Sequence, residues 1–413
     1  MTIDRVVIVG AGQAGFEVAA SLRHGKYPGA ITILGNESHA PYQRPPLSKA
    51  YLNGAVAEAE LMLRGAGYYG DHGITVESDA RVESIDRKAA TIRTANGGTV
   101  PYDHLVLATG ARNRALQVPG SDLEGVLALR GIADAQALRE RLRDTRRLVV
   151  VGAGFIGLEV AAVAAARGIE VSVVELSHRV MGRVVSIEMA EYFVDAHVRQ
   201  QVAFHFRDKP VRIVGKGGAV TGVELESGKE LAADCVLVAI GVTPDIELAT
   251  DAGLPTDNGI LVDASLRTAD PAISAIGDCA RFPDRYGDPL LRLESVQNAV
   301  DQGRHVAARI LSDAPTAPYH AVPWFWSDQG KMRLQIAGVT AGSDEHVPCG
   351  SRETGSFSVV CFRHGELIGV ESVNRAGDHM AARRLLRDGP RLTPEQAAAD
   401  GFDLKSWVKG TIK

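Results

Sequence analysis

Residues Arg5 to Gly15 read Arg-Val-Val-Ile-Val-Gly-Ala-Gly-Gln-Ala-Gly, an apolar run that leads directly into a glycine-rich turn. A helical pattern follows from Phe16 to Leu22, and a second apolar run covers Ala30 to Leu34. This order predicts a unit of strand, helix and strand. In such a unit the first glycine permits the tight turn, the second lets the backbone approach a pyrophosphate, and the third lets the helix pack on the strand; here they are Gly10, Gly12 and Gly15. The motif therefore predicts a dinucleotide whose phosphates lie at the helix N-terminus.

The same unit occurs a second time, between Arg147 and Glu175. Leu148–Val151 reads as a strand, Phe155–Arg167 as a helix and Glu170–Val174 as the next strand, and the turn contains Gly152, Gly154 and Gly157. Glu175 follows at close to the offset of about 20 residues expected for a carboxylate that binds ribose hydroxyls. Such a carboxylate would repel a 2'-phosphate, so NADH is favoured over NADPH, although Arg179 and Arg183 downstream leave NADPH open.

The composition limits the kind of protein. A chain of 413 residues is longer than one compact core usually holds, so two or three domains are expected. Its 44 glycines exceed the usual share of about 7%, which suits close approaches of the backbone to ligands. The formal net charge of -5 gives no electrostatic basis for binding nucleic acid or an anionic membrane surface, and we expect neither partner.

The cysteines and the start of the chain indicate the compartment. No two of the four cysteines form a close pair, which fits a reducing environment; they are Cys235, Cys279, Cys349 and Cys361. The chain begins Met-Thr-Ile-Asp-Arg and enters its first strand at once, which leaves no room for a signal peptide. No apolar run reaches the roughly 18 residues of a membrane span. We therefore expect a cytoplasmic protein. The 12 histidines show no metal-ligand spacing, so no metal is predicted.

Two segments after the first unit carry candidate ligands. Asn36 and Glu37 stand just beyond the second strand, where an acid could accept hydrogen bonds from an adenosine ribose, although a solvated loop carboxylate fits equally well. Residues 40–49 read Ala-Pro-Tyr-Gln-Arg-Pro-Pro-Leu-Ser-Lys, and the three prolines prevent a regular helix. Arg44 and Lys49 are thereby held on a stiff loop, where they could meet a flavin and its phosphates.

The order of segments predicts an α/β fold with two Rossmann-like, doubly wound domains and a C-terminal α+β domain. Short strands are expected between residues 74 and 109, and the chain returns to the first domain from about 246 to 318. Beyond that point, alternating stretches such as Met332–Val339 and Phe357–Phe362 indicate a sheet with terminal helices. The predicted boundaries are 1–112 and 246–318 for the first nucleotide domain, 113–245 for the second, and 319–413 for the C-terminal domain.

Essentially end to end, the chain resembles the putidaredoxin-reductase type of ferredoxin reductase, an FAD- and NADH-dependent family that serves bacterial oxygenases. The matching segments are the two glycine turns, Tyr42 to Lys49, Ala108-Thr109-Gly110, Gly241 to Pro244, Ile276 to Cys279, Glu294-Ser295-Val296 and Trp324-Phe325-Trp326-Ser327-Asp328-Gln329. The resemblance implies a glutathione-reductase-like architecture. It also implies electron transfer from NADH through FAD to a small acidic two-iron, two-sulfur ferredoxin, by a monomer or weak dimer.

The resemblance further implies roles for single residues. FAD would be bound by the first glycine turn with Ala14, and by Asn36 or Glu37, Arg44, Val82, Arg130, Asp278 and Val296. NADH would be held by Gly152, Gly154, Gly157 and Glu175, with Ile156, Gly241 and Glu294 near the nicotinamide arm. Lys49 would pair with Glu159 close to flavin N5, and Trp326 would lie beside the isoalloxazine, facing the partner. Lys49, Glu159 and Trp326 are thus the expected catalytic residues.

The route by which electrons leave separates the related families. A disulfide reductase needs a redox cysteine pair, and an NADH peroxidase or oxidase needs a cysteine in the loop 42–49, and neither is present. The alternatives that stay open are a monodehydroascorbate-type reductase and a signalling flavoprotein like apoptosis-inducing factor. A basic rim that steers a ferredoxin is expected among five cations, Arg292, Arg304, Arg309, Lys331 and Arg333. The alternative is that these are ordinary scattered surface charges.

Overall fold

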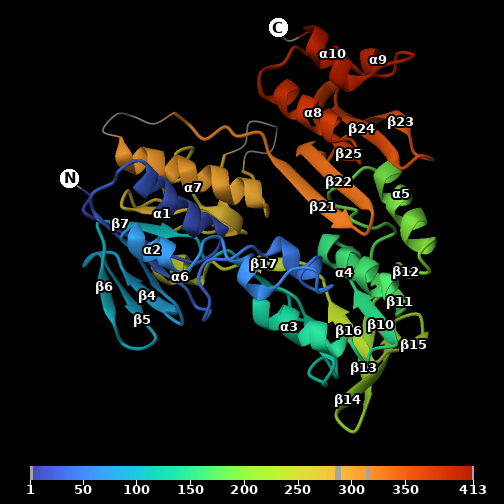
Figure 1. Ribbon diagram of the computed structural model, residues 1–413, viewed down its shortest axis with the longest axis horizontal. Helices are drawn as coiled ribbons and strands as arrows, with labels where there is room; N and C mark the ends of the chain where they lie inside the picture. The colour runs from blue at the N-terminus through green and yellow to red at the C-terminus, as the bar shows by residue number, and fades with distance from the viewer. Residues whose placement is uncertain (1–2, 284–289, 313–316, 412–413) are drawn as a thin grey trace. The chain divides into compact units, whose positions relative to one another are not determined.

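The computed structural model describes residues 3–283, 290–312 and 317–411 (Figure 1). The chain forms two compact units, each assembled from three segments. Unit 1 comprises Met1–Gln43, Glu58–Arg112 and Val242–Ala321, and unit 2 comprises Arg44–Ala57, Asn113–Gly241 and Val322–Lys413. The short strands β8 (Ala111–Asn113) and β17 (Val242–Pro244) pair where the chain passes from one segment to the next. The three-domain division with its nucleotide assignments stays a prediction.

The core of unit 1 is a five-stranded parallel sheet in the order β19-β7-β1-β2-β3. Its strands are β1 (Arg5–Val9), β2 (Ala30–Leu34), β3 (Ile74–Glu77), β7 (His104–Leu107) and β19 (Ile273–Ala275). They are rich in buried Val, Ile and Leu, because a parallel sheet is covered on both faces. β1 lies between β7 and β2. The turn after β1 therefore leaves the sheet at its carboxyl edge, where doubly wound folds bind ligands.

Two long helices of unit 1 pack against each other, α1 (Gln13–His24) and α7 (Val296–Leu311). Gly303 permits this contact, because a β-carbon there would lie 3.1 Å from the Ala14 carbonyl oxygen. The shorter helices are α2 (Gly67–Asp71), α6 (Glu247–Asp251), η2 (Glu58–Leu61) and η3 (Gly277–Cys279). An antiparallel sheet contains β4 (Val82–Asp86), β5 (Thr91–Thr94) and β6 (Thr99–Pro101), and β18 (Ile260–Leu261) pairs with β20 (Ala280–Arg281).

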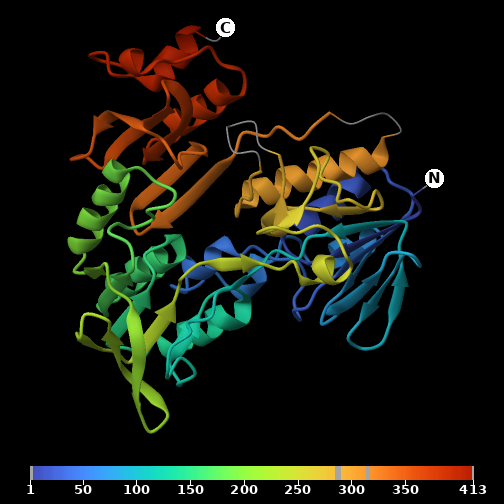
Figure 2. The same ribbon diagram turned by 180° about the vertical axis from the view of Figure 1, so that it is seen from behind.

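The second glycine motif lies in a matching parallel sheet of unit 2, in the order β12-β11-β10-β16-β9. Its strands are β9 (Val126–Ala128), β10 (Arg147–Val151), β11 (Glu170–Glu175), β12 (Ala203–Phe206) and β16 (Cys235–Val238). The helices are η1 (Pro45–Ser48), α3 (Ile132–Arg141), α4 (Phe155–Ala166) and α5 (Ile187–Val198). An antiparallel sheet of β13 (Pro210–Lys216), β14 (Ala219–Leu225) and β15 (Glu230–Ala232) extends from it, yellow-green in Figure 2.

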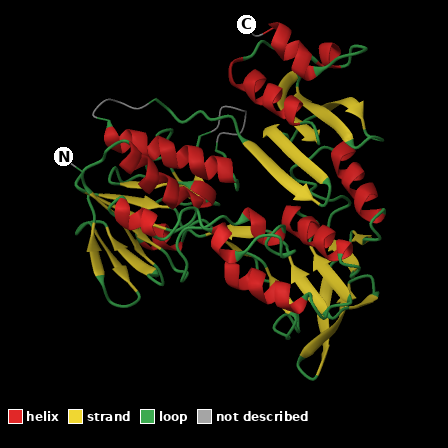
Figure 3. Ribbon diagram, viewed as in Figure 1, coloured by secondary structure: helices red, strands yellow, loops and turns green. Residues whose placement is uncertain are grey.

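The C-terminal part of unit 2 is a five-stranded antiparallel sheet. Figure 3 shows its strands in yellow and the accompanying helices in red. Its order is β21-β22-β25-β24-β23, from β21 (Trp324–Gln329), β22 (Met332–Gly338), β23 (Glu345–Ser351), β24 (Ser356–Arg363) and β25 (Glu366–Val373). The helices are α8 (Ala376–Asp388), α9 (Pro394–Ala397) and α10 (Leu404–Thr411), and α8 packs on β22 and β25. The predicted fold class, parallel Rossmann-like sheets followed by an α+β region, is confirmed.

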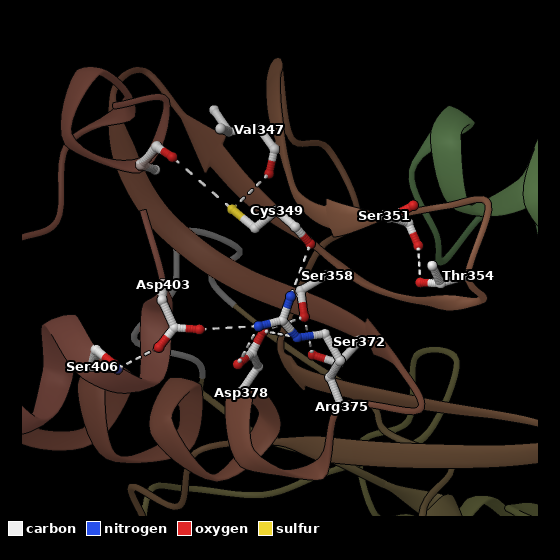
Figure 4. A network of polar contacts seen from close by, with 11 residues as sticks. Val347, Cys349, Ser351, Thr354, Ser358, Ser372, Arg375, Asp378, Asp403 and Ser406 are labelled. Carbon is white, nitrogen blue, oxygen red and sulfur yellow. Dashed lines mark hydrogen bonds and ion pairs between the residues drawn. The ribbon is translucent and has the colours of Figure 1, made fainter. Parts of the chain in front are cut away.

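A polar network fixes α8 on this sheet (Figure 4). The Arg375 guanidinium donates to Asp378 at 2.8 Å and to Asp403 at 3.1 Å. Asp378 is buried and also accepts a hydrogen bond of 2.8 Å from the Ser358 hydroxyl, which in turn contacts Ser372. Because a buried carboxylate is tolerated only when it is paired and hydrogen-bonded, these bonds set the position of α8 relative to the strands.

Candidate functional site

The first glycine turn has the shape that a pyrophosphate requires. Gly10 has a φ of +119°, and a β-carbon there would lie 2.1 Å from the Ala108 carbonyl oxygen. A β-carbon at Gly15 would lie 2.1 Å from the Gly10 carbonyl oxygen. Gly12 differs, because a β-carbon there would meet no atom within 4 Å. The first and third glycines are therefore required by the fold, whereas the middle one leaves open space in front of the turn.

The second turn repeats this geometry residue for residue. Gly152 has a φ of +101°, and its β-carbon would lie 2.4 Å from the Ala239 carbonyl oxygen. At Gly157 the β-carbon would lie 2.3 Å from the Gly152 carbonyl oxygen, whereas Gly154 would again meet nothing within 4 Å. The two turns therefore have the same backbone geometry, and both leave open space in front of the middle glycine.

Both turns leave the first N–H groups of a helix available to an anion. Gly12 and Gly154 are the N-caps of α1 and α4, in extended conformation and without a side-chain capping bond. Neither helix has an acidic residue in its first turn. Unsatisfied N–H groups and the positive end of the helix dipole favour a phosphate at such a terminus. The residues present therefore fit two dinucleotides.

Substituting the middle glycines should separate the two sites. Gly154→Ala is expected to fold normally and to raise the KM for NADH about tenfold or more, because its methyl group fills the space in front of the turn. Gly12→Ala should instead weaken retention of FAD. Thermal unfolding, flavin content after gel filtration and steady-state kinetics measure these effects. Gly157→Ala is the contrasting control, and it should destabilise the fold because its β-carbon meets backbone. Equal KM values for Gly154→Ala and the unmodified protein would contradict the assignment.

Glu175 ends β11 and is tied to the second turn. Its Oε2 accepts the Ala153 backbone N–H at 2.8 Å, and its Oε1 accepts the Ser177 N–H at 2.8 Å. The carboxylate is therefore fixed beside the glycine turn, and each oxygen retains a lone pair for a ribose hydroxyl. Two apolar side chains of this region are exposed, Leu176, which follows Glu175, at 67% and Ile156 near the start of α4 at 42%.

The predicted FAD ligands of unit 1 lie around the first sheet. Glu37 follows β2, and its Oε2 accepts the Tyr42 hydroxyl at 2.6 Å, whereas the neighbouring Asn36 is exposed. Asp278 is in η3, where Gly277 has a φ of +74° and donates its N–H to Gln302 at 2.7 Å. The other predicted FAD ligands are Ala14 in α1, Val82 at the start of β4 and Val296 at the start of α7. Glu294, which was predicted to lie near the nicotinamide arm, pairs with Arg292 at 2.7 Å.

The structure brings Lys49 and Glu159 together in unit 2. The Lys49 Nζ lies 2.7 Å from Glu159 Oε2 and 3.2 Å from the Pro45 carbonyl oxygen. Glu159 is 2% exposed, on α4, and Lys49 directly follows η1, whose opening prolines fix the loop. The ion pair that the resemblance implied is therefore present.

Two serines that sequence reasoning missed complete the coordination of this carboxylate. Ser48 donates to Glu159 Oε2, and Ser327 on β21 donates to Oε1 at 2.6 Å. With Lys49, the buried carboxylate accepts three hydrogen bonds, which offsets the cost of removing it from water. Both serines lie inside the motif segments quoted above, but nothing in a sequence shows that a hydroxyl faces a distant carboxylate.

Alternation along β21 explains how Ser327 and Trp326 are placed. Successive side chains of a strand point to opposite faces. Phe325 contacts Phe155 with ring centroids 4.5 Å apart, and Ser327 contacts Glu159, so both face α4. Trp326 faces the other side with Trp324, at a centroid distance of 5.7 Å. In the same unit Arg44 donates to the Arg130 carbonyl oxygen at 2.9 Å, which brings together two of the residues expected to contact FAD. Gly241 accepts the Arg114 N–H at 3.0 Å.

The expected basic rim needs correction at Arg309. This residue is 6% exposed, and its guanidinium contacts Ser265, Ser274 and His104. Burial and the neighbouring Arg309 charge lower the pKa of His104 to about 3, so the imidazole is neutral and serves as an acceptor. Arg309 is therefore a structural cation. Arg292 is also largely buried, with 12% of its side chain exposed, whereas Arg304, Lys331 and Arg333 are exposed.

The four cysteines are free thiols in buried positions. Burial raises the pKa of Cys235 to about 12 and that of Cys349 to about 11, and it raises the pKa of Cys279 and Cys361 as well. Because the thiolate is the reactive form, these residues are poor nucleophiles and poor redox groups. Within residues 3–283, 290–312 and 317–411, no group of three or more His, Cys, Asp or Glu side chains could hold a metal ion.

Hydropathy and helix length bear on membrane insertion. In the part of the chain that the structure describes, none of the helices combines the length and the apolar character that a bilayer-spanning segment needs.

Comparisons with known proteins agree with this geometry. Residues 4–303 match the model of the pyridine nucleotide-disulphide oxidoreductase family, and residues 324–408 match the reductase C-terminal family. Rhodocoxin reductase from Rhodococcus erythropolis is 50% identical over 97% of this chain and 93% of its own length. Putidaredoxin reductase from Pseudomonas putida is 36% identical over 98% and 97%.

Solved structures extend the similarity to three dimensions. The ferredoxin reductase for the CYP199A2 system from Rhodopseudomonas palustris superimposes with a TM-score of 0.95 at 51% identity, covering 98% of this chain and 100% of that one. The reductase in a covalent putidaredoxin reductase–putidaredoxin complex gives a TM-score of 0.95 at 35% identity, with 100% and 99% covered. The chain therefore belongs to the pyridine nucleotide-disulphide oxidoreductase family, as an FAD- and NAD-dependent oxidoreductase with a reductase C-terminal domain.

Proposed function

We propose that the protein carries electrons from NADH through FAD to a two-iron, two-sulfur ferredoxin that serves a monooxygenase or dioxygenase. The observation that carries this proposal is the combination of two dinucleotide-binding turns with four buried thiols of raised pKa. Electrons that enter from a pyridine nucleotide have no accessible cysteine to pass to. Bound FAD would therefore pass electrons to the acceptor without a cysteine relay, and we assign a protein as that acceptor.

The cofactor supplies the redox chemistry, because bound FAD can take two electrons as a hydride and release them one at a time. The chain positions and charges the surroundings. Among the described residues, two of the three Lys49 ammonium N–H groups are used, by Glu159 and by the Pro45 carbonyl group, which leaves one donor for a ligand. A fixed positive group with a spare donor stabilises negative charge that develops next to it. We assign Lys49 this role, with Arg44 and Arg130 binding FAD and Trp326 facing the acceptor.

NADH is the proposed electron donor, and Glu175 is the proposed reason. Its carboxylate lies beside the second glycine turn and would repel a 2'-phosphate. Glu175→Ala is expected to narrow the ratio of kcat/KM for NADH over NADPH about tenfold, by weakening NADH binding and removing the repulsion. Glu170→Ala, at the exposed start of the same strand, is the matched control. If the ratio of kcat/KM for NADH over NADPH were unchanged in Glu175→Ala, Glu175 would not be the residue that binds the ribose.

The proposed docking surface for the ferredoxin lies on α8 and the β21–β22 turn of unit 2. The exposed cations are Lys331 in the turn, Arg333 near the start of β22, and Arg384 and Arg387 on α8. Met380 on α8 is 59% exposed. Arg383 lies over the Trp324 ring, 4.6 Å from its centroid. Exposed cations together with an exposed apolar side chain suit a small acidic partner, and electrostatic steering makes its association fast and dependent on salt.

The decisive experiment is an anaerobic titration with NADH, followed by addition of an oxidised two-iron ferredoxin. Bleaching of the flavin and rapid reduction of the ferredoxin, slowed by added salt, are the expected results. A rubredoxin is the second acceptor to test, because a relative from Pseudomonas putida that is 40% identical is named rubredoxin-NAD(+) reductase. Ascorbyl radical is the third. The proposal would be refuted if the reduced protein did not reduce the two-iron ferredoxin, and reduction of rubredoxin or of ascorbyl radical alone would point to that other acceptor.

The cytoplasm is the proposed location, since reduced thiols and a dinucleotide electron donor both suit it. A monomer or weak dimer remains the prediction for the oligomeric state. Gel filtration at several protein concentrations would measure it.

A further inference from the structure

A chain of buried polar groups continues beyond the Lys49–Glu159 ion pair. Ser327 donates to Glu159 at 2.6 Å, the Gln329 side-chain amide contacts the Ser327 hydroxyl at 3.3 Å, and the other end of that amide contacts His197 Nε2 at 2.8 Å. Ser327, Gln329 and His197 are each 0% exposed. All of these groups belong to unit 2, on α4, β21 and α5.

The orientation of the Gln329 amide gives this chain a direction. Gln329 Nε2 lies 3.7 Å from the Met181 sulfur as well as facing Ser327. A thioether only accepts hydrogen bonds, so the NH₂ group faces Met181 and the carbonyl oxygen faces His197. His197 Nε2 must then carry the hydrogen. The imidazole is neutral, because burial lowers its pKa.

With this direction, every donor in the chain points toward Glu159. His197 donates to Gln329, and Gln329 donates to the Ser327 oxygen. Since that lone pair of Ser327 is occupied, its single O–H is directed at Glu159. Aligned hydrogen bonds polarise one another in a dry interior, so this alignment strengthens the hydrogen bond from Ser327 to Glu159.

We propose that Ser327, Gln329 and His197 form a positioning chain that holds the Glu159 carboxylate, and through it the Lys49 ammonium, in place. The inference rests on the proposed function, in which Lys49 acts next to the flavin. Among the described residues, Glu159 contacts Lys49, Ser48 and Ser327, and the chain continues from Ser327 to His197. Asp328 adjoins Ser327 but pairs with Arg333.

The test compares two buried serines of the same unit. Ser327→Ala removes the donor to Glu159, whereas Ser358→Ala removes the donor to the structural carboxylate Asp378. Ser327→Thr keeps the hydroxyl, and Gln329→Met breaks the chain at similar volume. Each variant is studied as the FAD-loaded protein, by stopped-flow reduction with NADH and by ferredoxin turnover.

Ser327→Ala is expected to lower kcat about tenfold at unchanged KM for NADH. Gln329→Met should lower kcat by a few-fold, and Ser327→Thr should restore the original kcat. Ser358→Ala should lower only the thermal midpoint. The inference would be overturned if the folded Ser327→Ala or Gln329→Met variant had the same kcat as Ser358→Ala. An unmodified protein that reduces no iron protein would instead refute the proposed function.

Discussion

Lys49→Met is expected to lower NADH-driven ferredoxin reduction by about 10²–10³-fold, which is typical when one preorganised donor to developing charge is removed. The same variant should also unfold more easily, by about 3 kcal/mol, because it leaves Glu159 as a buried carboxylate without its cation. Stopped-flow kinetics of the FAD-loaded protein and denaturant unfolding measure the two effects separately.

A double variant distinguishes the role of Lys49 in the fold from its role in the reaction. Lys49→Met with Glu159→Gln removes the unpaired charge, so most of the lost stability should return while the rate stays low. Lys216→Met, at an exposed lysine of the same unit, should change neither quantity. Recovery of both stability and rate in the double variant would show that Lys49 has only a structural role.

The glycine turns could be predicted from the sequence because their chemistry is local. Gly10 and Gly152 have positive φ angles, and Gly15 and Gly157 pack against backbone only a few residues away. Spacing along the chain therefore carries the information. The elements around them, β1 and β10 in particular, are continuous apolar runs, which is the signature of strands buried on both faces.

The environment of Glu159 could not be predicted in the same way. Its two serine donors are 111 and 168 residues distant in sequence, and only the tertiary fold brings these hydroxyls together. The pair with Lys49 was expected solely from the resemblance. The misassignment of Arg309 has the opposite origin, since a cation is assumed to be exposed unless burial is known. Here neutral acceptors, namely Ser274, His104 and a carbonyl group, replace water around the guanidinium.

A second buried acidic side chain, Glu371 on β25, joins the C-terminal sheet to α5. Its Oε1 accepts the Ser186 N–H at 2.9 Å, and its Oε2 accepts the Ser186 hydroxyl at 2.6 Å. Ser186 is the N-cap of α5. Unlike Glu159, this carboxyl group has no cation within ion-pair distance among the described residues, and Glu188 adds negative charge nearby. Burial raises the pKa of Glu371 from 4.5 to about 7.

This raised pKa makes stability depend on pH with a definite sign. The folded protein keeps the Glu371 proton up to about pH 7, whereas the unfolded chain releases it near its ordinary pKa of 4.5. The stabilisation is therefore complete below pH 4.5 and is lost as the pH rises to about 7, up to about 3 kcal/mol in all. Glu371→Gln mimics the protonated form, so it should match the unmodified protein at about pH 5 and be more stable at about pH 8. Thermal midpoints at the two pH values measure this. Glu366→Gln, exposed on the same strand, should keep the original pH dependence. If Glu371→Gln loses as much stability between the two pH values as the unmodified protein does, Glu371 is not the group that titrates.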